Sequence, residues 1–545
     1  MDALTLFPIP SSSRFLAPSP GTRKTLSPHP RPHLPSSTSS ASHPTRRNLK
    51  LRVSTSDSPS VAVPAGKPES DSISAVESSG DRFDWYSQWY PVAPVCDLDK
   101  RAPRAVTVLG IDLVVWWDRE KERWRVFEDR CAHRLAPLSE GRIDRWGRLQ
   151  CVYHGWCFDG SGSCKLIPQA PFDGPPVHTS SKACVATYPC YVQNNIVWFW
   201  PRTESQHKDI PGECKPPNIP EIDDPSYTCT MGIRDIPYGY EVLIENLMDP
   251  AHVPYAHHKI MRIPKRPPSL TRDREGGIPV DIRIENLDIT GFLAKQQFGY
   301  GKFVAPCLYY AFFPSTGLSN GSASSSNNQT MPPPTFLQKQ RRFLLVFYCI
   351  PVSPGKSRLI WVFPRNFSVW VDQIVPRWMF HVGQNLILDS DLYLLHVEER
   401  KIAEVGNSNW QKACFVPTKS DGMVTAFRRW MKRYANDRVD WGNKFAGFLP
   451  PSPPREQLLD RYWSHVVHCR SCSSALKGMR ALEAALPVVS LALIGAVAAA
   501  KQTLMTPATR IAVVSTAVFC FAASKWLSHF IHKIFYFHDY NHAFK

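Results

Sequence analysis

The stretch that decides the fold is Cys131-Ala-His133, followed after seventeen residues by Cys151-Val-Tyr-His154-Gly-Trp156. Each half pairs one thiol with one imidazole, and the flanking sequence predicts that each pair sits on a tight loop between short strands. Two cysteines and two histidines are also a zinc set. Because each pair mixes a thiol with an imidazole, the sequence favours a [2Fe–2S] cluster instead of zinc. In this cluster Cys131 and Cys151 hold one iron, and His133 and His154 hold the other.

This ligand set is that of a Rieske centre. Two neutral imidazoles in place of two thiolates make the cluster less negative, which raises its reduction potential above that of a four-thiolate ferredoxin. Such a cluster can accept electrons from a ferredoxin and pass them on. Tight turns around it are predicted at Gly155, Gly160 and Gly162. Cys157 and Cys164 also lie here, either as a loop-bracing disulfide or, in a reducing compartment, as buried free thiols.

The cluster motif lies inside a predicted β domain of residues 83–201. Short alternating apolar runs predict its strands at Val106–Leu109, Leu113–Trp117, Trp124–Phe127 and Ile196–Trp200. Strands and helices mix from 202 to 460, with a helical region at 373–400 that is interrupted near Pro376. A Ser/Asn/Gly run at 315–335 ends in prolines and predicts a disordered insertion. The fold class is therefore α+β.

About ninety residues after the cluster motif comes Asp249-Pro-Ala-His252-Val-Pro-Tyr-Ala-His257. Taken alone, this spacing is only moderately specific, since such histidines often cap helices or pack in a core. Iron(II) that activates O2 is bound by two imidazoles and one carboxylate on one face. His252 and His257 are the predicted imidazoles. Asp391 is the predicted carboxylate and Asp389 the alternative, and either aspartate is otherwise an ordinary solvated helix residue.

The two ends of the chain differ from its middle. Residues 1–53 hold eight basic residues and one acid, are rich in Ser and Pro, and have no continuous apolar core. This composition predicts an organelle transit peptide rather than a secretory signal, with a plain disordered tail as the alternative. Residues 54–82 predict a disordered linker. The net charge of +17 is partly concentrated in this first segment, and zinc-finger and single-strand-binding patterns are lacking, so nucleic-acid binding is not expected.

Near the C-terminus, residues 484–530 hold the apolar runs Ala484–Ala500 and Ile511–Ser524. Each is shorter than the roughly 20 residues of a bilayer-spanning helix, but their pairing predicts a transmembrane helical hairpin. The alternative is a buried pair of helices packed on the catalytic domain. More basic residues flank the hairpin at its main-domain end than lie in the loop between its two helices. They are Lys477, Arg480, Lys525 and Lys533. This asymmetry places the main domain and the tail, 531–545, on the positive side of the membrane.

A C-x2-C pair, Cys469-Arg-Ser-Cys472, lies in the segment 461–483 just before the hairpin. It lacks the βαβ context of a thioredoxin fold, and the motif alone is weak. A strand–helix G-x-G-x-x-G turn and plant-type ferredoxin spacing are both lacking, so the reductase is expected to be a separate protein.

These motifs resemble the plant Rieske non-haem iron oxygenases. That family includes pheophorbide a oxygenase, chlorophyllide a oxygenase and the Rieske proteins of the chloroplast-envelope translocon, and the resemblance is greatest to its protochlorophyllide-dependent translocon components. The similar stretches cover nearly all of 83–545 outside the insertion; they include Phe83–Pro91, His133–Gly141, Gly147–Trp156, Ile236–Tyr240, Glu245–His257 and Phe537–His542. Ala132 stands where many relatives have proline, which removes some loop rigidity but no ligand.

The resemblance implies a Rieske β domain followed by a helix-grip, START-like catalytic domain, assembled as a homotrimer. It implies that Asp249 joins His154 of one subunit to His252 of its neighbour and so carries electrons between the two metal centres. Asn246 is a candidate catalytic residue beside it. The alternative for Asp249 is a local turn cap.

The resemblance also implies a monooxygenase that uses ferredoxin electrons and O2 on a chlorophyll-type tetrapyrrole. Ring-methyl hydroxylation of protochlorophyllide or chlorophyllide is favoured over ring opening of pheophorbide a. The implied location is the chloroplast inner envelope or thylakoid membrane, with the catalytic domain in the stroma. Cys469 and Cys472 would be a thioredoxin-reducible regulatory pair, or else two unpaired surface thiols. The competing functions are a redox-sensing component of the envelope import machinery, with translocon contacts, and a pure electron-transfer protein. Neither needs His252, His257 and Asp391.

Overall fold

The computed structural model describes residues 82–207, 209–261, 277–296, 299–314, 341–445, 448–501 and 504–544. The predicted transit peptide, nearly all of the predicted linker and the predicted insertion at 315–335 lie outside these residues.

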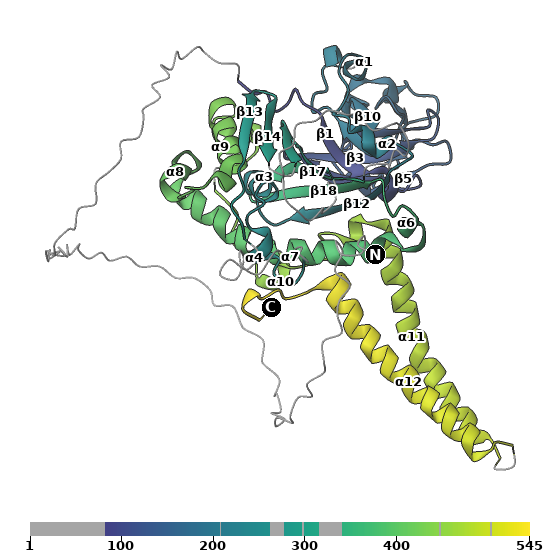
Figure 1. Ribbon diagram of the computed structural model, residues 1–545. Coiled ribbons are helices and arrows are strands. Elements are labelled where there is room, and N and C mark those ends of the chain that lie inside the picture. Colours follow the sequence, from purple (N-terminus) through teal and green to yellow (C-terminus); the bar gives the residue numbers. More distant parts are fainter. Residues whose placement is uncertain are drawn as a thin grey trace, which may run out of the picture. The chain divides into compact units, whose positions relative to one another are not determined.

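The N-terminal domain consists of three small antiparallel sheets (Figure 1). The first has the order β1–β11–β10, with bounds Tyr90–Pro94, Ile196–Phe199 and Cys190–Gln193. The second has the order β2–β3–β4–β9, with bounds Arg104–Val108, Ile111–Asp118, Arg123–Glu128 and Thr187–Tyr188. The third has the order β5–β6–β7–β8, with bounds Arg142–Ile143, Leu149–Gln150, Cys157–Phe158 and Cys164–Leu166. The predicted β domain is confirmed, and its four predicted strands correspond to β2, β3, β4 and β11.

The second domain is built on a seven-stranded antiparallel sheet of order β12–β18–β17–β16–β15–β14–β13 (Figure 1). Their bounds, in that order, are Thr228–Ile236, Lys356–Arg365, Arg342–Ser353, Leu308–Pro314, Gly299–Val304, Gly291–Gln296 and Arg283–Asp288. The helices α3 (Tyr240–Met248), α7 (Arg377–Val405) and α9 (Gly422–Tyr434) pack on the strands and on one another. The α+β class is therefore confirmed.

The predicted interruption of the helical region near Pro376 is also confirmed. A short helix, α6 (Trp370–Ile374), ends before Pro376, which is extended (φ −60°, ψ 142°) and caps the start of the 29-residue α7. A proline is suited to this place because it has no N–H to donate and its ring fixes φ. At the other end α7 stops at Gly406, whose φ of 86° favours glycine. The long helix carries both candidate aspartates.

The two domains share one apolar core. A single cluster of buried side chains includes Trp89 and Trp198 of the first domain and Trp361 and Trp430 of the second. The backbone joins them as well, because the N–H groups of Leu109 and Gly110 donate to carbonyl oxygens of β17 at 2.8 and 2.9 Å. A separate, smaller core lies beneath the cluster loops and includes Trp116, Phe127, Cys131 and Cys151. The predicted cluster ligands are thus supported by a core of their own.

Two long helices, α11 (Arg470–Ala499) and α12 (Pro507–Ile531), pack side by side and form the predicted hairpin (Figure 1). The first helix spans 30 residues, and α12 together with the turn that continues it, Pro507–Tyr536, also spans 30. The most apolar parts of the two segments have mean hydropathies of 2.0 and 1.6, so both are long and apolar enough to cross a membrane. The apolar runs alone underestimated these lengths. Only 6% and 17% of these most apolar parts are buried, so the alternative of a buried helical pair packed on the catalytic domain is wrong.

Polar side chains join the two hairpin helices. The Ser490 hydroxyl of α11 donates to the Ala517 carbonyl oxygen at 2.8 Å, and the Ser524 hydroxyl of α12 donates to the Glu483 carbonyl oxygen at 2.9 Å. Small hydroxyl residues at a helix interface both allow close approach and satisfy their own donors, as in membrane helix pairs.

Candidate cluster and iron sites

The two cluster loops have the same backbone conformation, although their ligand spacings differ. In each loop the cysteine N–H donates to the carbonyl oxygen five residues on, at 2.9 Å for both Cys131 and Cys151. The N–H four residues on donates back to the cysteine carbonyl oxygen, from Leu135 at 3.0 Å and from Gly155 at 3.1 Å. Both of these residues have positive φ, 61° and 77°. Each cysteine therefore opens a tight loop, and the two loops form a matched pair.

The four predicted cluster ligands lie together, with the thiols inside and the imidazoles outside. Cys131 and Cys151 are 1% and 2% exposed, whereas His133 is exposed and His154 half-buried. The two imidazole rings are 4.5 Å apart at 75°, and His133 also stacks on Trp156 at 4.7 Å. This arrangement fits a [2Fe–2S] group whose thiolate-bound iron faces the core and whose imidazole-bound iron faces the surface.

Burial, together with the neighbouring Cys151, raises the pKa of Cys131 to about 12, so without iron this thiol is protonated. The thiolate is the form that binds iron, so cluster assembly must displace this proton. Cys157 and Cys164 are both buried and free, so the alternative of buried thiols is the one that the structure has.

The three residues predicted for the mononuclear iron come from two segments. His252 and His257 flank the short helix α4 (Val253–Ala256), and Asp391 lies on α7. Their candidate ligand atoms all lie within 4.8 Å of one another. His257 Nε2 is 3.6 Å from Asp391 Oδ2, and the imidazole centroids of His252 and His257 are 5.1 Å apart. Two imidazoles and one carboxylate in one cluster fit iron(II) with positions left open.

The tautomer of His257 is set by Ser390, which the sequence did not point to. The Ser390 hydroxyl donates to the Ile387 carbonyl oxygen at 2.6 Å, so it accepts from His257 Nδ1–H at 2.8 Å. His257 Nε2 is then unprotonated and faces Asp391. A hydrogen bond of this kind to the distal ring nitrogen is what orients metal-binding histidines.

His252 has polar partners at both ring nitrogens. Asp249 Oδ2 lies 3.5 Å from His252 Nδ1, and the Asn246 side-chain amide lies 3.5 Å from His252 Nε2. Burial opposes a charge on this imidazole, but the carboxylates of Asp249 and Asp391 outweigh it and raise the pKa of His252. Asp249 therefore acts on His252 within the chain and also accepts the Ala251 N–H at 2.7 Å, as the turn-cap alternative predicts.

Asp389 and Asp391 have different partners, although they are two residues apart on one helix. Asp389 lies between Arg234 and Arg461, at 2.7 and 2.5 Å, and all three side chains are at most 1% exposed. Residues two apart on a helix point to nearly opposite sides, so Asp391 faces the histidines while Asp389 faces the arginines. Asp389 is a buried counter-ion, and Asp391 is the carboxylate of the histidine cluster. The alternative that either aspartate is an ordinary solvated helix residue is therefore wrong for both.

Burial shifts the pKa values of this cluster in opposite directions. It raises the pKa of Asp391 to about 7 and lowers that of His257 to about 3, because a buried site disfavours each charged form. His257 is thus neutral and ready to bind a metal. A divalent cation bound here would compensate the negative charge of the buried Asp391 carboxylate.

The C-x2-C pair is not on the surface. Cys469 and Cys472 are 1% and 3% exposed, so the alternative of two surface thiols is wrong. His381 and His465 lie beside them, and sequence reasoning missed both. A signal was present for His465, which lies four residues before Cys469.

A cavity of about 1000 Å³ is formed by the start of α3, the end of α7 and residues 436–445 and 448–449, and the iron cluster does not line it. The aromatic side chains of Tyr238, Tyr240 and Phe303 are at most 1% exposed and belong to the core.

Comparison with known proteins gives two family models. The Rieske [2Fe-2S] domain matches residues 88–189, and pheophorbide a oxygenase matches residues 303–409, which include Asp391. The chain is 57% identical to protochlorophyllide-dependent translocon component 52 of Arabidopsis thaliana, over 87% of this chain and 88% of that protein. It is 53% identical to flavonoid 8-hydroxylase 2 of Ocimum basilicum, over 92% and 93%.

A more distant relative is pheophorbide a oxygenase of rice (Oryza sativa subsp. japonica), 33% identical over 98% of both chains. Among solved structures, dicamba monooxygenase bound to dicamba is 19% identical, with a TM-score of 0.48 over 64% of this chain and 96% of that one. The curated relatives named here are chloroplastic. The chain therefore belongs to the chloroplast Rieske oxygenase family that includes pheophorbide a oxygenase.

Proposed function

We propose that this chain is a monooxygenase that hydroxylates a chlorophyll-type tetrapyrrole, with electrons from ferredoxin and oxygen from O2. The observation that carries the proposal is the cluster of His252, His257 and Asp391, two imidazoles and one carboxylate around a common point. A pure electron-transfer protein has no use for a second set of ligands. Iron(II) bound there would supply the activation of O2, as in other sites with this facial triad.

The protein's own side chains prepare that site. Ser390 keeps the proton of His257 on Nδ1, so its Nε2 is directed at the metal position, and the Asp249 carboxylate lies 3.5 Å from His252 Nδ1. Asp391 is only 4% exposed, so its carboxylate is shielded from bulk solvent. The seven-stranded sheet with the long helix α7 supports a helix-grip arrangement for this domain.

The catalytic unit is proposed to be a homotrimer in which Asp249 joins the two metal centres of neighbouring subunits. Within one chain, His154 and Asp249 share no hydrogen bond in the part that the structure describes. His133 is exposed and His154 half-buried, so the imidazole edge of the cluster is free to meet a neighbouring subunit. Asp249 is 26% exposed, so its carboxylate is accessible to such a partner.

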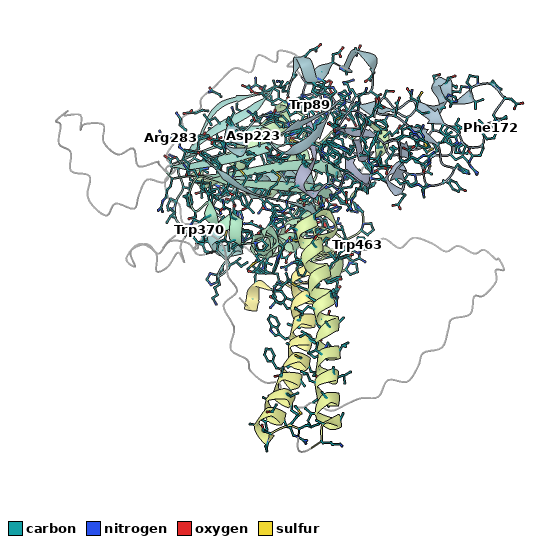
Figure 2. All side chains as sticks on the ribbon, turned by 90° about the vertical axis from the view of Figure 1, so that its right-hand side faces the viewer. Trp89, Phe172, Asp223, Arg283, Trp370 and Trp463 are labelled. Carbon is teal, nitrogen blue, oxygen red and sulfur yellow. The ribbon has the colours of Figure 1, made fainter. Side chains whose placement is uncertain are left out.

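The hairpin is proposed to anchor the enzyme in the inner envelope or thylakoid membrane, with the catalytic domain in the stroma. Trp370 and Trp463 are 61% and 71% exposed and lie on the side of the catalytic domain from which the hairpin extends (Figure 2). Exposed tryptophans are typical of the membrane–water interface. The basic residues at the domain end of the hairpin support the same orientation.

The substrate class rests on relatives, which point in two directions. The name of the 57% identical relative refers to protochlorophyllide, and the second family model is that of pheophorbide a oxygenase. Ring-methyl hydroxylation of protochlorophyllide or chlorophyllide is therefore favoured over ring opening of pheophorbide a. The second candidate is hydroxylation of a flavonoid, because a flavonoid 8-hydroxylase is 53% identical over 92% of this chain.

The test uses the full chain in detergent, reconstituted with iron under anaerobic conditions and reduced by ferredoxin. O2 is then admitted in the presence of protochlorophyllide, chlorophyllide a, pheophorbide a or a flavone, and products are identified by mass spectrometry with ¹⁸O2. The matched control is His252→Ala, which keeps all four cluster ligands. An ¹⁸O-labelled tetrapyrrole from the wild type alone supports the proposal, whereas a labelled flavone alone supports the second candidate.

If the cluster is reduced and reoxidised normally but no substrate gains oxygen, the oxygenase proposal fails. The remaining interpretation is then a redox-sensing component of the envelope import machinery, which the name of one relative, translocon component 52, also suggests.

A further inference from the structure

A second group of metal-type ligands lies outside the sites described above. His381 of α7, His465, Cys469 and Cys472 are 0%, 1%, 1% and 3% exposed. Their ligand atoms all lie within 4.8 Å of one another. The cysteines open α11, and His465 precedes them in the connecting segment. Four such groups gathered in the core, at the base of the membrane hairpin, require an explanation.

The distances match the edges of a metal tetrahedron. His381 Nδ1 is 3.4 Å from both Cys469 Sγ and Cys472 Sγ, and His465 Nε2 is 3.2 Å from Cys472 Sγ. Zinc bonds of about 2.3 Å to sulfur and about 2.0 Å to nitrogen place tetrahedral S and N ligands about 3.5 Å apart. A zinc ion would fit among these atoms with only small adjustments.

Both imidazoles are oriented as zinc ligands are. His381 Nε2 donates to the Met231 carbonyl oxygen at 3.0 Å, and His465 Nδ1 donates to the Ile233 carbonyl oxygen at 2.6 Å. A carbonyl only accepts, so these two nitrogens carry the protons. The other nitrogen of each ring is then unprotonated and faces the sulfurs. Met231 and Ile233 are alternate residues of β12, which therefore orients both rings from one strand.

The surroundings also favour negative sulfur. The guanidinium of Arg377 lies 3.6 Å from Cys469 Sγ, and the Cys472 N–H at the start of α11 donates to the same sulfur at 3.5 Å. A cation and a helix N-terminus both stabilise thiolates. Both cysteines are free. A thioredoxin-reducible disulfide would need to be accessible to a protein thiolate, and this pair is buried.

We propose that His381, His465, Cys469 and Cys472 bind one Zn²⁺ in a closed, tetrahedral structural site. Binding exchanges the two thiol protons for the metal: Zn²⁺ plus two thiols gives the dithiolate complex and two released protons, with no change of oxidation state. A set of two thiolates and two imidazoles with no open position is typical of structural zinc rather than of a catalytic metal. The ion would fasten α11, and with it the hairpin, to α7, the helix that carries Asp391.

The test measures metal content in the full chain, purified in detergent and treated with EDTA. Zinc and iron are quantified by mass spectrometry in the wild type, in the double variant Cys469→Ser/Cys472→Ser, and in the control Cys414→Ser, which removes a half-buried thiol elsewhere. The expected result is one zinc per chain in the wild type and the control and none in the double variant. The Rieske absorption spectrum should be the same in all three.

His465→Cys keeps the inference testable if the double variant does not fold, because a three-cysteine, one-histidine site still binds zinc. With Co²⁺ in place of Zn²⁺, this variant should show stronger and red-shifted tetrahedral d–d bands than the wild type. Zinc well below one per chain in a wild type with full iron would overturn the proposal, as would zinc retained by the double variant. Iron at this position would exclude zinc as its natural occupant. A disulfide would also contradict the zinc site. If the wild type contains no zinc, and Cys469 and Cys472 can be alkylated only after reduction, the two cysteines form a disulfide and the redox-pair interpretation holds.

Discussion

Replacing Asp389 by asparagine should destabilise the catalytic domain strongly, while the same replacement at Asp391 should not. Asp389 is the shared counter-ion of Arg234 and Arg461, at 2.7 and 2.5 Å, and none of the three side chains is more than 1% exposed. Removing one partner of a buried ion pair leaves an uncompensated charge, which costs about 3–5 kcal/mol.

The lower end of that range is expected here. Arg234 Nη1 still donates to the Asn385 carbonyl oxygen at 3.2 Å, and Arg461 Nη1 still donates to the carbonyl oxygens of Lys533 and Ile534, each at 3.1 Å. For a domain of this size, a loss of about 3 kcal/mol lowers the melting temperature by about 6–12 °C. The assay is thermal unfolding of the full chain in detergent, with the cluster present and the mononuclear iron omitted.

Asp391→Asn is the matched control. Burial raises the pKa of Asp391 to about 7, so at about pH 6 the carboxyl is mostly neutral and asparagine is close to its isostere. Its melting temperature should stay within about 2–4 °C of the wild type, the equivalent of roughly 1 kcal/mol. The assignment of the two aspartates is refuted if Asp389→Asn melts with the wild type, or if Asp391→Asn is the less stable of the two.

Three further predictions concern the metal sites. Ser390→Ala removes the acceptor that orients His257, so affinity for the mononuclear iron should fall about 10–100-fold in an anaerobic iron titration, and an unchanged affinity would contradict the role of Ser390. Iron(II) uptake should strengthen as pH rises and level off above about 7. Protons compete for Asp391 and for His252, whose pKa values are both raised, while His257, with its pKa lowered to about 3, is already neutral. A pH-independent affinity would argue against Asp391 and His252 as ligands. Asp249→Asn should slow reoxidation of the reduced cluster in the presence of substrate and O2 about tenfold or more, because the group beside His252 Nδ1 loses its charge. Stopped-flow absorbance measures this rate, and the iron and sulfide contents should be unchanged. A wild-type rate would show that Asp249 takes no part in electron transfer.

Much of the fold and of the cluster site could be predicted from the sequence because the signals are local. Cys131 with His133 and Cys151 with His154 each lie within one loop, so their spacing alone reports a ligand pair. Pro376 marked the start of α7 for the same reason, since its ring determines its own φ. The hairpin followed from two apolar runs, although only the structure showed how far the helices extend beyond them.

Tertiary structure alone decided which residues from distant segments meet. Asp389 and Asp391 are equivalent in sequence, since both are acidic and lie two residues apart among apolar neighbours on α7, and the packing of α7 turns one toward two arginines and the other toward two histidines. His381 is 88 residues from Cys469, and only the packing of α7 against α11 brings the two side chains to 3.4 Å. Ligand pairs within one loop are set by local chain geometry, whereas ligands on separate elements are set by how those elements bury their faces, which no spacing records.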